Sequence, residues 1–165
     1  MKLKNYILAF LIIGALGTLG HFVYNWSSEN TILGYFTPVN ESTWEHLKLL
    51  FFPTLIFSVF EYFLMKEKPQ NYPFAVSISL LIGLISIVTI FYTYSGVLGF
   101  KIEWFNIAIY YIALLIMLIT KAILLSLKLE VGILNCIALI WIFVMALTFI
   151  FFTYNPLDLG IFKER

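Results

Sequence analysis

Titratable side chains gather in one short stretch of this sequence, residues 39–48, which reads Val-Asn-Glu-Ser-Thr-Trp-Glu-His-Leu-Lys. Ser42 is followed three residues later by Glu45, the spacing of a capping box, in which the hydroxyl and the carboxylate each accept a hydrogen bond from a backbone N–H. The stretch therefore predicts the start of a helix. Because the N–H groups and the positive dipole end of a helix favour anions and carboxylates, we expect ligand chemistry here.

A second polar group precedes this stretch by one loop. His21, Tyr24 and Asn25 are three and four residues apart, so they share one face of a helix. If the helices on either side of the loop are antiparallel neighbours, His21 meets His46 or Glu45 across them. We expect His21, Glu45 and His46 to be the titrating groups of one site, and the remaining members of that site are Tyr24, Asn40, Glu41, Trp44 and Lys48.

Three interpretations of these residues remain open. Histidine and glutamate are zinc ligands, and a carboxylate beside an imidazole can activate a water molecule. His21, Glu45 and His46 are the candidate ligands, although no His-Glu-x-x-His spacing is present and adjacent helical residues point about 100° apart. The same three groups suit a site for a proton or a substrate. Alternatively, Glu45 serves the helix cap, Lys48 pairs with it or with Glu41, and both imidazoles make buried hydrogen bonds.

Composition sets the class of protein. The 165 residues are 62% hydrophobic and 12% charged, whereas about a quarter of a typical soluble domain is charged. The sequence therefore predicts an integral membrane protein. A net charge of +1 provides no basic field for nucleic acid, which argues against a nucleic-acid partner. Cys136 is the single cysteine, so the chain has neither an intrachain disulfide nor a cysteine-based metal motif.

Apolar segments of membrane-spanning length occur five times, at residues 6–26, 44–65, 73–94, 104–127 and 131–152. Segments of this length must be helical in lipid, because their backbone groups have no other partners there. We predict an all-α, polytopic transmembrane bundle of five spans in a single domain, residues 1–165. Lys2 and Lys4 precede the first segment as in a signal peptide, but its apolar character continues to Trp26, so we expect it to be retained.

The distribution of basic residues predicts the orientation of the chain in the cell membrane. With a cytoplasmic N-terminus, the inner segments contain Lys2, Lys4, Lys66, Lys68 and Lys128. The outer segments then contain Lys48, Lys101, Lys163 and Arg165. The loop before residue 42 contains no Lys or Arg, which also fits the outer face. We therefore expect the site and the C-terminus to lie outside.

Polar residues within the apolar segments predict a second cluster. Glu61 and Lys121 are expected at similar depths, because the second and fourth spans run in the same direction. A Glu61–Lys121 ion pair would offset the cost of burying each charge in lipid. We expect an intramembrane polar cluster made of Glu61, Tyr62, Lys121 and Asn135. The alternative is that Lys121 extends to the interface and Glu61 makes only a packing hydrogen bond.

Residues 39–48 also carry a resemblance to known proteins. Together with His21 and the Asn155-Pro156 segment, they resemble a family of small bacterial polytopic membrane proteins of unknown function. The resemblance covers nearly the whole chain and is most specific at residues 40–46. It implies a membrane location and the position of the site, but it supplies no activity, cofactor or substrate.

The function that we expect from the sequence is binding or translocation of a small polar or charged solute at the outward-facing site. Because five spans seldom enclose a transport path alone, we expect a homodimer or a partner membrane subunit in the bilayer. One alternative is a membrane-embedded, metal-assisted hydrolase that acts on a lipid-linked substrate. Another is a non-catalytic subunit or assembly factor. The sequence does not identify a cofactor.

Overall fold

The structure is a computed structural model that describes residues 3–127 and 129–164. The described chain is all-helical, with five helices long and apolar enough to cross a membrane: α1 (Leu3–Trp26), α3 (Thr43–Leu64), α4 (Tyr72–Leu98), α5 (Glu103–Ser126) and α6 (Gly132–Tyr154). The predicted fold class is confirmed. Two short elements were not predicted, α2 (Thr31–Gly34) and the 3₁₀ helix η1 (Gly160–Phe162). Lys2, Lys128 and Arg165, which entered the orientation argument, lie outside the described residues.

Local signals in the sequence define the ends of the helices. Ser42 is the N-cap of α3, and Pro73 stands in the first turn of α4, where its missing N–H costs nothing. Helix α4 extends to Leu98, four residues beyond the predicted boundary at residue 94. It ends at Gly99, whose φ of 76° places it in the left-handed conformation that closes many helices.

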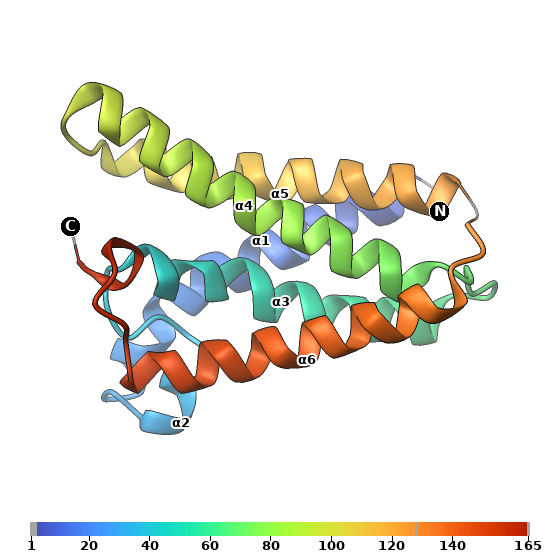
Figure 1. Ribbon diagram of the computed structural model, residues 1–165, viewed down its shortest axis with the longest axis horizontal. Helices are drawn as coiled ribbons and strands as arrows, with labels where there is room; N and C mark the ends of the chain where they lie inside the picture. The colour runs from blue at the N-terminus through green and yellow to red at the C-terminus, as the bar shows by residue number, and fades with distance from the viewer. Residues whose placement is uncertain (1–2, 128, 165) are drawn as a thin grey trace.

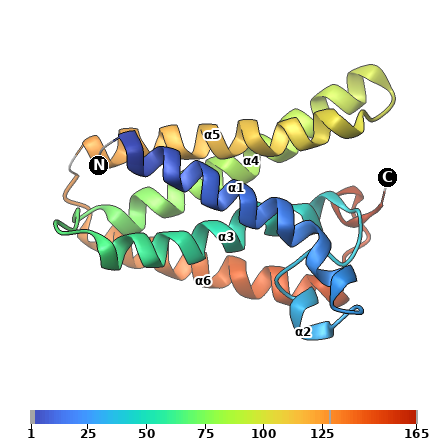
Figure 2. The same ribbon diagram turned by 180° about the vertical axis from the view of Figure 1, so that it is seen from behind.

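The long helices run back and forth along one bundle (Figure 1). Helix α1 packs against α3 and α5, α4 packs against α3, α5 and α6, and the α4–α5 hairpin extends beyond its neighbours at one end (Figures 1 and 2). We call the end where α1 begins and α3 finishes the N-terminal end. The opposite end contains the junctions on either side of α2, the start of α3 and the last described residues.

A close approach between α1 and its neighbours depends on Gly17. A Cβ atom at this position would lie 2.0 Å from the hydroxyl oxygen of Tyr110 in α5 and 2.6 Å from the carbonyl oxygen of Leu49 in α3. The Tyr110 hydroxyl in turn donates a hydrogen bond to the carbonyl of Ile13 at 2.9 Å. Three helices therefore meet where α1 lacks a side chain, and this contact sets the register between α1 and α3.

We predict that Gly17→Ala destabilises the bundle, because the added methyl group must displace a backbone carbonyl or break the Tyr110 hydrogen bond. Overpacking of this kind typically costs about 1–3 kcal/mol. Gly96→Ala is the matched control, since a Cβ atom at Gly96 meets nothing within 4 Å. In detergent, thermal unfolding should show a lower Tm for Gly17→Ala and not for Gly96→Ala. Equal Tm values for the two variants would contradict the tight contact.

Candidate functional site

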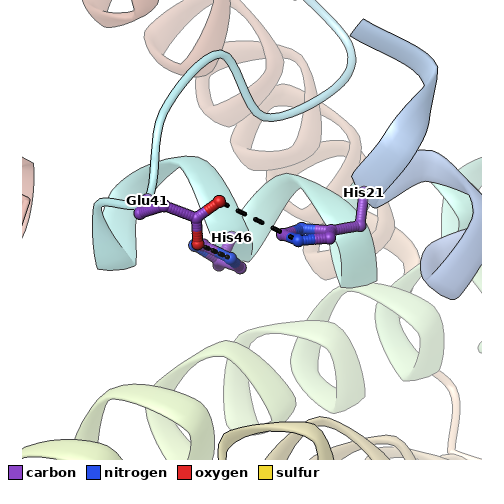
Figure 3. A group of neighbouring side chains, drawn as sticks. All are labelled: His21, Glu41 and His46. Atoms are coloured by element: carbon purple, nitrogen blue, oxygen red, sulfur yellow. Dashed lines mark ion pairs between the residues drawn. The ribbon is translucent and has the colours of Figure 1, made fainter. Parts of the chain in front are cut away.

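His21, Glu41 and His46 meet at the opposite end of the bundle from the N-terminus, and we call them the His-Glu-His cluster. The Glu41 carboxylate faces both rings from one side (Figure 3), with Oε2 at 3.4 Å from Nε2 of His46 and Oε1 at 3.9 Å from Nε2 of His21. The ring centroids of His21 and His46 are 5.2 Å apart. The structure thus brings together two histidines that are separated by a whole loop in the sequence.

Three elements position the cluster. His21 comes from the last turns of α1, and His46 from the first turn of α3, which packs against α1. Glu41 precedes the N-cap residue Ser42 in a turn where Oδ1 of Asn40 accepts a hydrogen bond from the Ser42 N–H at 3.0 Å. This turn directs the Glu41 side chain toward the gap between the two helices (Figure 3).

The hydrogen bonding of His46 determines what its other nitrogen can do. Nδ1 lies 2.8 Å from the carbonyl oxygen of Ser42. A carbonyl oxygen only accepts hydrogen bonds, so Nδ1 must carry the hydrogen. In the neutral ring, Nε2 therefore presents a lone pair beside Glu41. That lone pair can bind a metal ion, or it can take a proton and form an ion pair with the carboxylate.

His21 has unused hydrogen-bonding capacity. Its Nδ1 atom is buried and has no hydrogen-bond partner among the described residues. Its Nε2 atom, at 3.9 Å from the Glu41 carboxylate, is beyond hydrogen-bond distance. A buried polar atom without a partner is costly and rare in folded proteins. Of the two nitrogens, Nε2 is the one that faces the cluster and can bind a further ligand there.

Glu41 is the solvent-facing member of the cluster, with a side chain that is 69% exposed. Its hydrogen bond with His46 lowers the pKa of the carboxyl group, and the positive charges of His46, His21 and Lys101 lower the pKa further, against a smaller opposing effect of partial burial. The carboxylate is thus ionised at neutral pH. It is available as an anionic ligand on the open side of the two imidazoles.

Glu45 and Lys48 form a buried pair with each other, which is one of the arrangements that the sequence left open. Their side chains are 3% and 0% exposed, and Nζ of Lys48 donates to Oε2 of Glu45 at 2.6 Å. Nζ also donates to the carbonyls of Gly34 at 2.9 Å and Thr37 at 3.3 Å, while Oε2 accepts from the Val39 N–H at 3.0 Å. This buried pair ties the loop to α3. Glu45 therefore does not face the imidazoles. Glu41 faces them instead, in the position that we expected for Glu45.

The capping box is also only partly formed. The Ser42 hydroxyl accepts a hydrogen bond from the Glu45 N–H at 3.3 Å, as its spacing predicts. The Glu45 carboxylate, however, bonds to the N–H of Val39 instead of that of Ser42. The reason is that Asn40 already occupies the Ser42 N–H. Asn40 thus shapes the turn and does not face the cluster as a ligand.

Trp44 and Tyr24, which we expected to be members of the site, lie in packing contacts nearby. The Trp44 ring packs between Phe149 of α6 and Phe162 of η1, with centroid distances of 4.7 and 4.8 Å. It therefore attaches the C-terminal segment to the start of α3. Tyr24 lies against α2, since a Cβ atom at Gly34 would be 3.0 Å from the Tyr24 ring.

The intramembrane polar cluster contains the expected ion pair, between Lys121 and Glu61, whose side chains are 3% and 8% exposed. Tyr72 completes it, because the Tyr72 hydroxyl lies 2.5 Å from the Glu61 carboxylate and 2.9 Å from the Ser58 carbonyl. Tyr62, which we expected in the cluster, packs its ring against the Tyr72 ring at a centroid distance of 5.3 Å.

Asn135 also lies outside the hydrogen bonds of this pair. Its side chain donates to the Gln70 carbonyl at 2.6 Å and accepts from the Phe74 N–H at 3.2 Å, so it joins α6 to the start of α4. Tyr72 was not predicted as a member of this cluster. Its position in the first turn of the next span, which returns the chain to the level of Glu61, could have indicated it.

We predict that Glu45→Gln and Lys48→Met are each strongly destabilising, because each leaves one buried charge without its partner. Loss of one partner of a buried pair costs about 3–5 kcal/mol. The double variant should lose less than the sum of the two single variants, as measured by thermal unfolding in detergent. Lys163→Met is the control, since its pair with Asp158 is exposed and such pairs contribute about 0–1 kcal/mol. Additive losses in the double variant would contradict the pairing.

We also predict a pH-dependent contribution from Glu41. A carboxyl whose pKa is lowered on folding stabilises the folded state above its ordinary value of 4.5. This contribution is lost as the pH falls through the lowered pKa. With a chelator present, the wild type should melt at a slightly higher temperature than Glu41→Gln near pH 6, and the difference should disappear on acidification. Glu29→Gln, in the exposed loop, serves as the control; a Glu41 effect that is independent of pH would contradict the assignment.

Comparisons with known proteins complete the description of this site. Neither the curated proteins nor the solved structures contain a match to the chain. The sequence model of one family, described as a family of unknown function (DUF6512), matches residues 1–165. The match covers the whole chain, including all residues of the His-Glu-His cluster. The chain therefore belongs to this family of unknown function.

Proposed function

We propose that the protein binds a divalent transition-metal ion, of the zinc type, at the His-Glu-His cluster. The observation that carries the proposal is that one potential ligand atom from each of His21, Glu41 and His46 lies within 4.8 Å of the other two. The three residues come from two helices and the intervening loop, so their proximity is a property of the tertiary structure.

The distances within the cluster suit a common ion. Zinc–nitrogen and zinc–oxygen bonds of about 2.0–2.2 Å, in tetrahedral geometry, place ligand atoms about 3.3 Å apart. The separation between His46 and Glu41 is 3.4 Å and that between His21 and Glu41 is 3.9 Å, each to a different carboxylate oxygen. One ligand atom from each residue lies within 4.8 Å of the other two, so the side chains would rotate inward to share one ion. Two imidazoles with a carboxylate favour zinc and its neighbours over magnesium or calcium, which prefer oxygen ligands alone.

The surroundings of the cluster support the same assignment. Metal-bound histidines usually donate their second N–H to a carboxylate or a backbone carbonyl, as His46 does to Ser42. A metal ion would bind His21 through Nε2, the ring nitrogen that faces the Glu41 carboxylate. With three protein ligands, one coordination position remains for water or another molecule, and the exposure of Glu41 leaves that side open.

The geometry supports metal binding more than translocation or hydrolysis. Translocation would need a path from the cluster toward Glu61, yet the cavity that includes Glu61 is lined on α1 no further than Leu16 and includes none of the three cluster residues. Hydrolysis would need a base beside the metal-bound water, and Glu45, which we expected to titrate there, is held by Lys48 and Val39. We therefore limit the proposal to capture of an ion from water.

The orientation of the site is part of the proposal. Lys4, Lys66 and Lys68 lie at the N-terminal end of the bundle, whereas Lys48, Lys101 and Lys163 lie toward the opposite end. Lys48 is buried in its ion pair with Glu45, so the remaining lysines are in excess at the N-terminal end, which favours a cytoplasmic N-terminus. The His-Glu-His cluster then faces away from the cytoplasm, and the ion would come from that side.

Titration with Co²⁺ tests the proposal, because tetrahedral Co²⁺ absorbs visible light. The detergent-purified, chelator-treated protein should bind one equivalent with a tetrahedral spectrum. His21→Ala, His46→Ala and Glu41→Gln should each weaken binding at least about tenfold, since loss of even an outer partner costs about 10–100-fold. Acidification should release the ion, because protons compete for the same nitrogen and oxygen atoms.

Glu29→Gln is the matched control for charge, and it should bind Co²⁺ like the wild type. Thermal unfolding verifies that each variant is folded before its affinity is compared. Absence of a tetrahedral spectrum in the wild type would overturn the proposal. So would a wild-type affinity in both Glu41→Gln and His46→Ala.

A further inference from the structure

A long groove opens at the N-terminal end of the bundle, far from the His-Glu-His cluster. It lies between α1 and α3, is closed by the end of α5, and has a volume of about 1610 Å³. This volume exceeds the roughly 300–1,000 Å³ of pockets that hold drug-sized ligands. The floor of the groove is apolar and is formed by Leu8, Ile12, Leu16, Ile56, Phe60 and Leu64.

The length of the groove matches one leaflet of a membrane. From Lys4 to Leu16 the groove follows α1 for twelve residues, which is about 18 Å at the helical rise. Half of a hydrocarbon core of about 30 Å is about 15 Å. An acyl chain that enters from one membrane surface would therefore lie along the whole apolar floor.

The mouth of the groove is positively charged. Lys4 from α1 and Lys66 and Lys68 from the loop after α3 line it, together with one carboxylate, Glu67, that has no ion pair among the described residues. Lys68 is held with its ammonium group 4.8 Å above the Tyr62 ring. Lysines grouped at the membrane surface attract anionic lipid head groups.

Two buried oxygen atoms in the lining have no hydrogen-bond donor among the residues that the structure describes. They are Oε1 of Glu61, on a side chain that is 8% exposed, and Oδ1 of Asn71, on a residue that is 1% exposed. Both residues line the groove. Because Lys121 already balances the charge of Glu61, the missing partner is a neutral donor such as a hydroxyl group and not a second cation.

From these features we propose that the groove is a binding site for an anionic glycerophospholipid with a hydroxyl-bearing head group, of the phosphatidylglycerol type. The acyl chain lies on the floor between α1 and α3. The phosphate lies among Lys4, Lys66 and Lys68, and a head-group hydroxyl donates to Glu61. The inference is independent of the metal site, because the two sites share no residue.

Native mass spectrometry of the full chain, released from detergent after titration with lipid, tests this assignment. Phosphatidylglycerol should bind at lower concentration than phosphatidylethanolamine, which has a donor but no net charge, and than phosphatidylcholine, which has neither. Equal binding of the three lipids would overturn the proposal. Equal binding of phosphatidylglycerol and phosphatidylethanolamine would overturn the requirement for an anion.

Two double variants distinguish a specific lipid-binding site from general charge attraction. Lys66→Gln with Lys68→Gln removes two charges at the mouth, and should weaken phosphatidylglycerol binding about 25-fold, the equivalent of about 1 kcal/mol for each lysine. Lys101→Gln with Lys163→Gln removes two charges away from the mouth, and should leave the affinity within a factor of two or so. An equal loss in the two double variants would show general charge attraction and overturn the site.

The apolar floor is tested by filling it. Ile12→Trp places a large ring in the groove, whereas Ile140→Trp places the same ring on the exposed face of α6, where Ile140 is 62% exposed. Only Ile12→Trp should weaken the binding of phosphatidylglycerol, at an unchanged Tm for both variants. Unaltered binding in a folded Ile12→Trp protein would overturn the position of the acyl chain.

Discussion

The buried ion pair between Glu45 and Lys48 is the interaction on which the His-Glu-His cluster depends. Nζ of Lys48 is surrounded by one carboxylate and two backbone carbonyls, and the same carboxylate holds the N–H of Val39. These bonds satisfy polar groups of the loop that would otherwise be buried without partners. They also fix where the chain turns before α3, and that turn brings the Glu41 carboxylate close to both His21 and His46. The ionic network is therefore structural, and its consequence is the geometry of the exposed cluster.

A second buried pair, Glu61 with Lys121, plays a comparable part at the other end of α3. Each charge is costly to bury, and the cost is offset only where the partner and additional hydrogen bonds are in place. Glu45 and Lys48 meet this condition within their network. Glu61 meets it only in part, because Oε1 has no donor among the described residues although Tyr72 and Lys121 contact Oε2. The Glu45–Lys48 pair therefore closes a loop, whereas the Glu61–Lys121 pair leaves Oε1 of Glu61 at the wall of the groove without a donor among the described residues.

Helix α3 thus connects two candidate sites of different chemistry. Its first turn contributes His46 to the cluster, and its last turns contribute Glu61 and Leu64 to the groove. The 22 residues of α3 span about 33 Å at the helical rise, comparable to a hydrocarbon core of about 30 Å. The two sites therefore lie at opposite membrane surfaces if α3 spans the bilayer. A metal ion at one and a lipid at the other would bind to the same rigid element.

The sequence by itself determined the class and the number of long helices, because apolar length is a local property and lipid allows only backbone bonding within each segment. It also determined the start of α3, since the Ser42 cap needs only the three residues that follow. The sequence alone did not determine the partners of the charged groups. The sequence does not distinguish the roles of Glu41 and Glu45, because both are glutamates near the start of α3. Only the path of the loop decided that Glu45 turns inward to Lys48 while Glu41 meets the imidazoles. Likewise, the packing of α4 against α3 brings the Tyr72 hydroxyl to Glu61, whereas Tyr62 is adjacent to Glu61 on α3 and adjacent helical residues do not face each other. Such pairings depend on rotation, register and loop path between helices, which spacing along one helix does not specify.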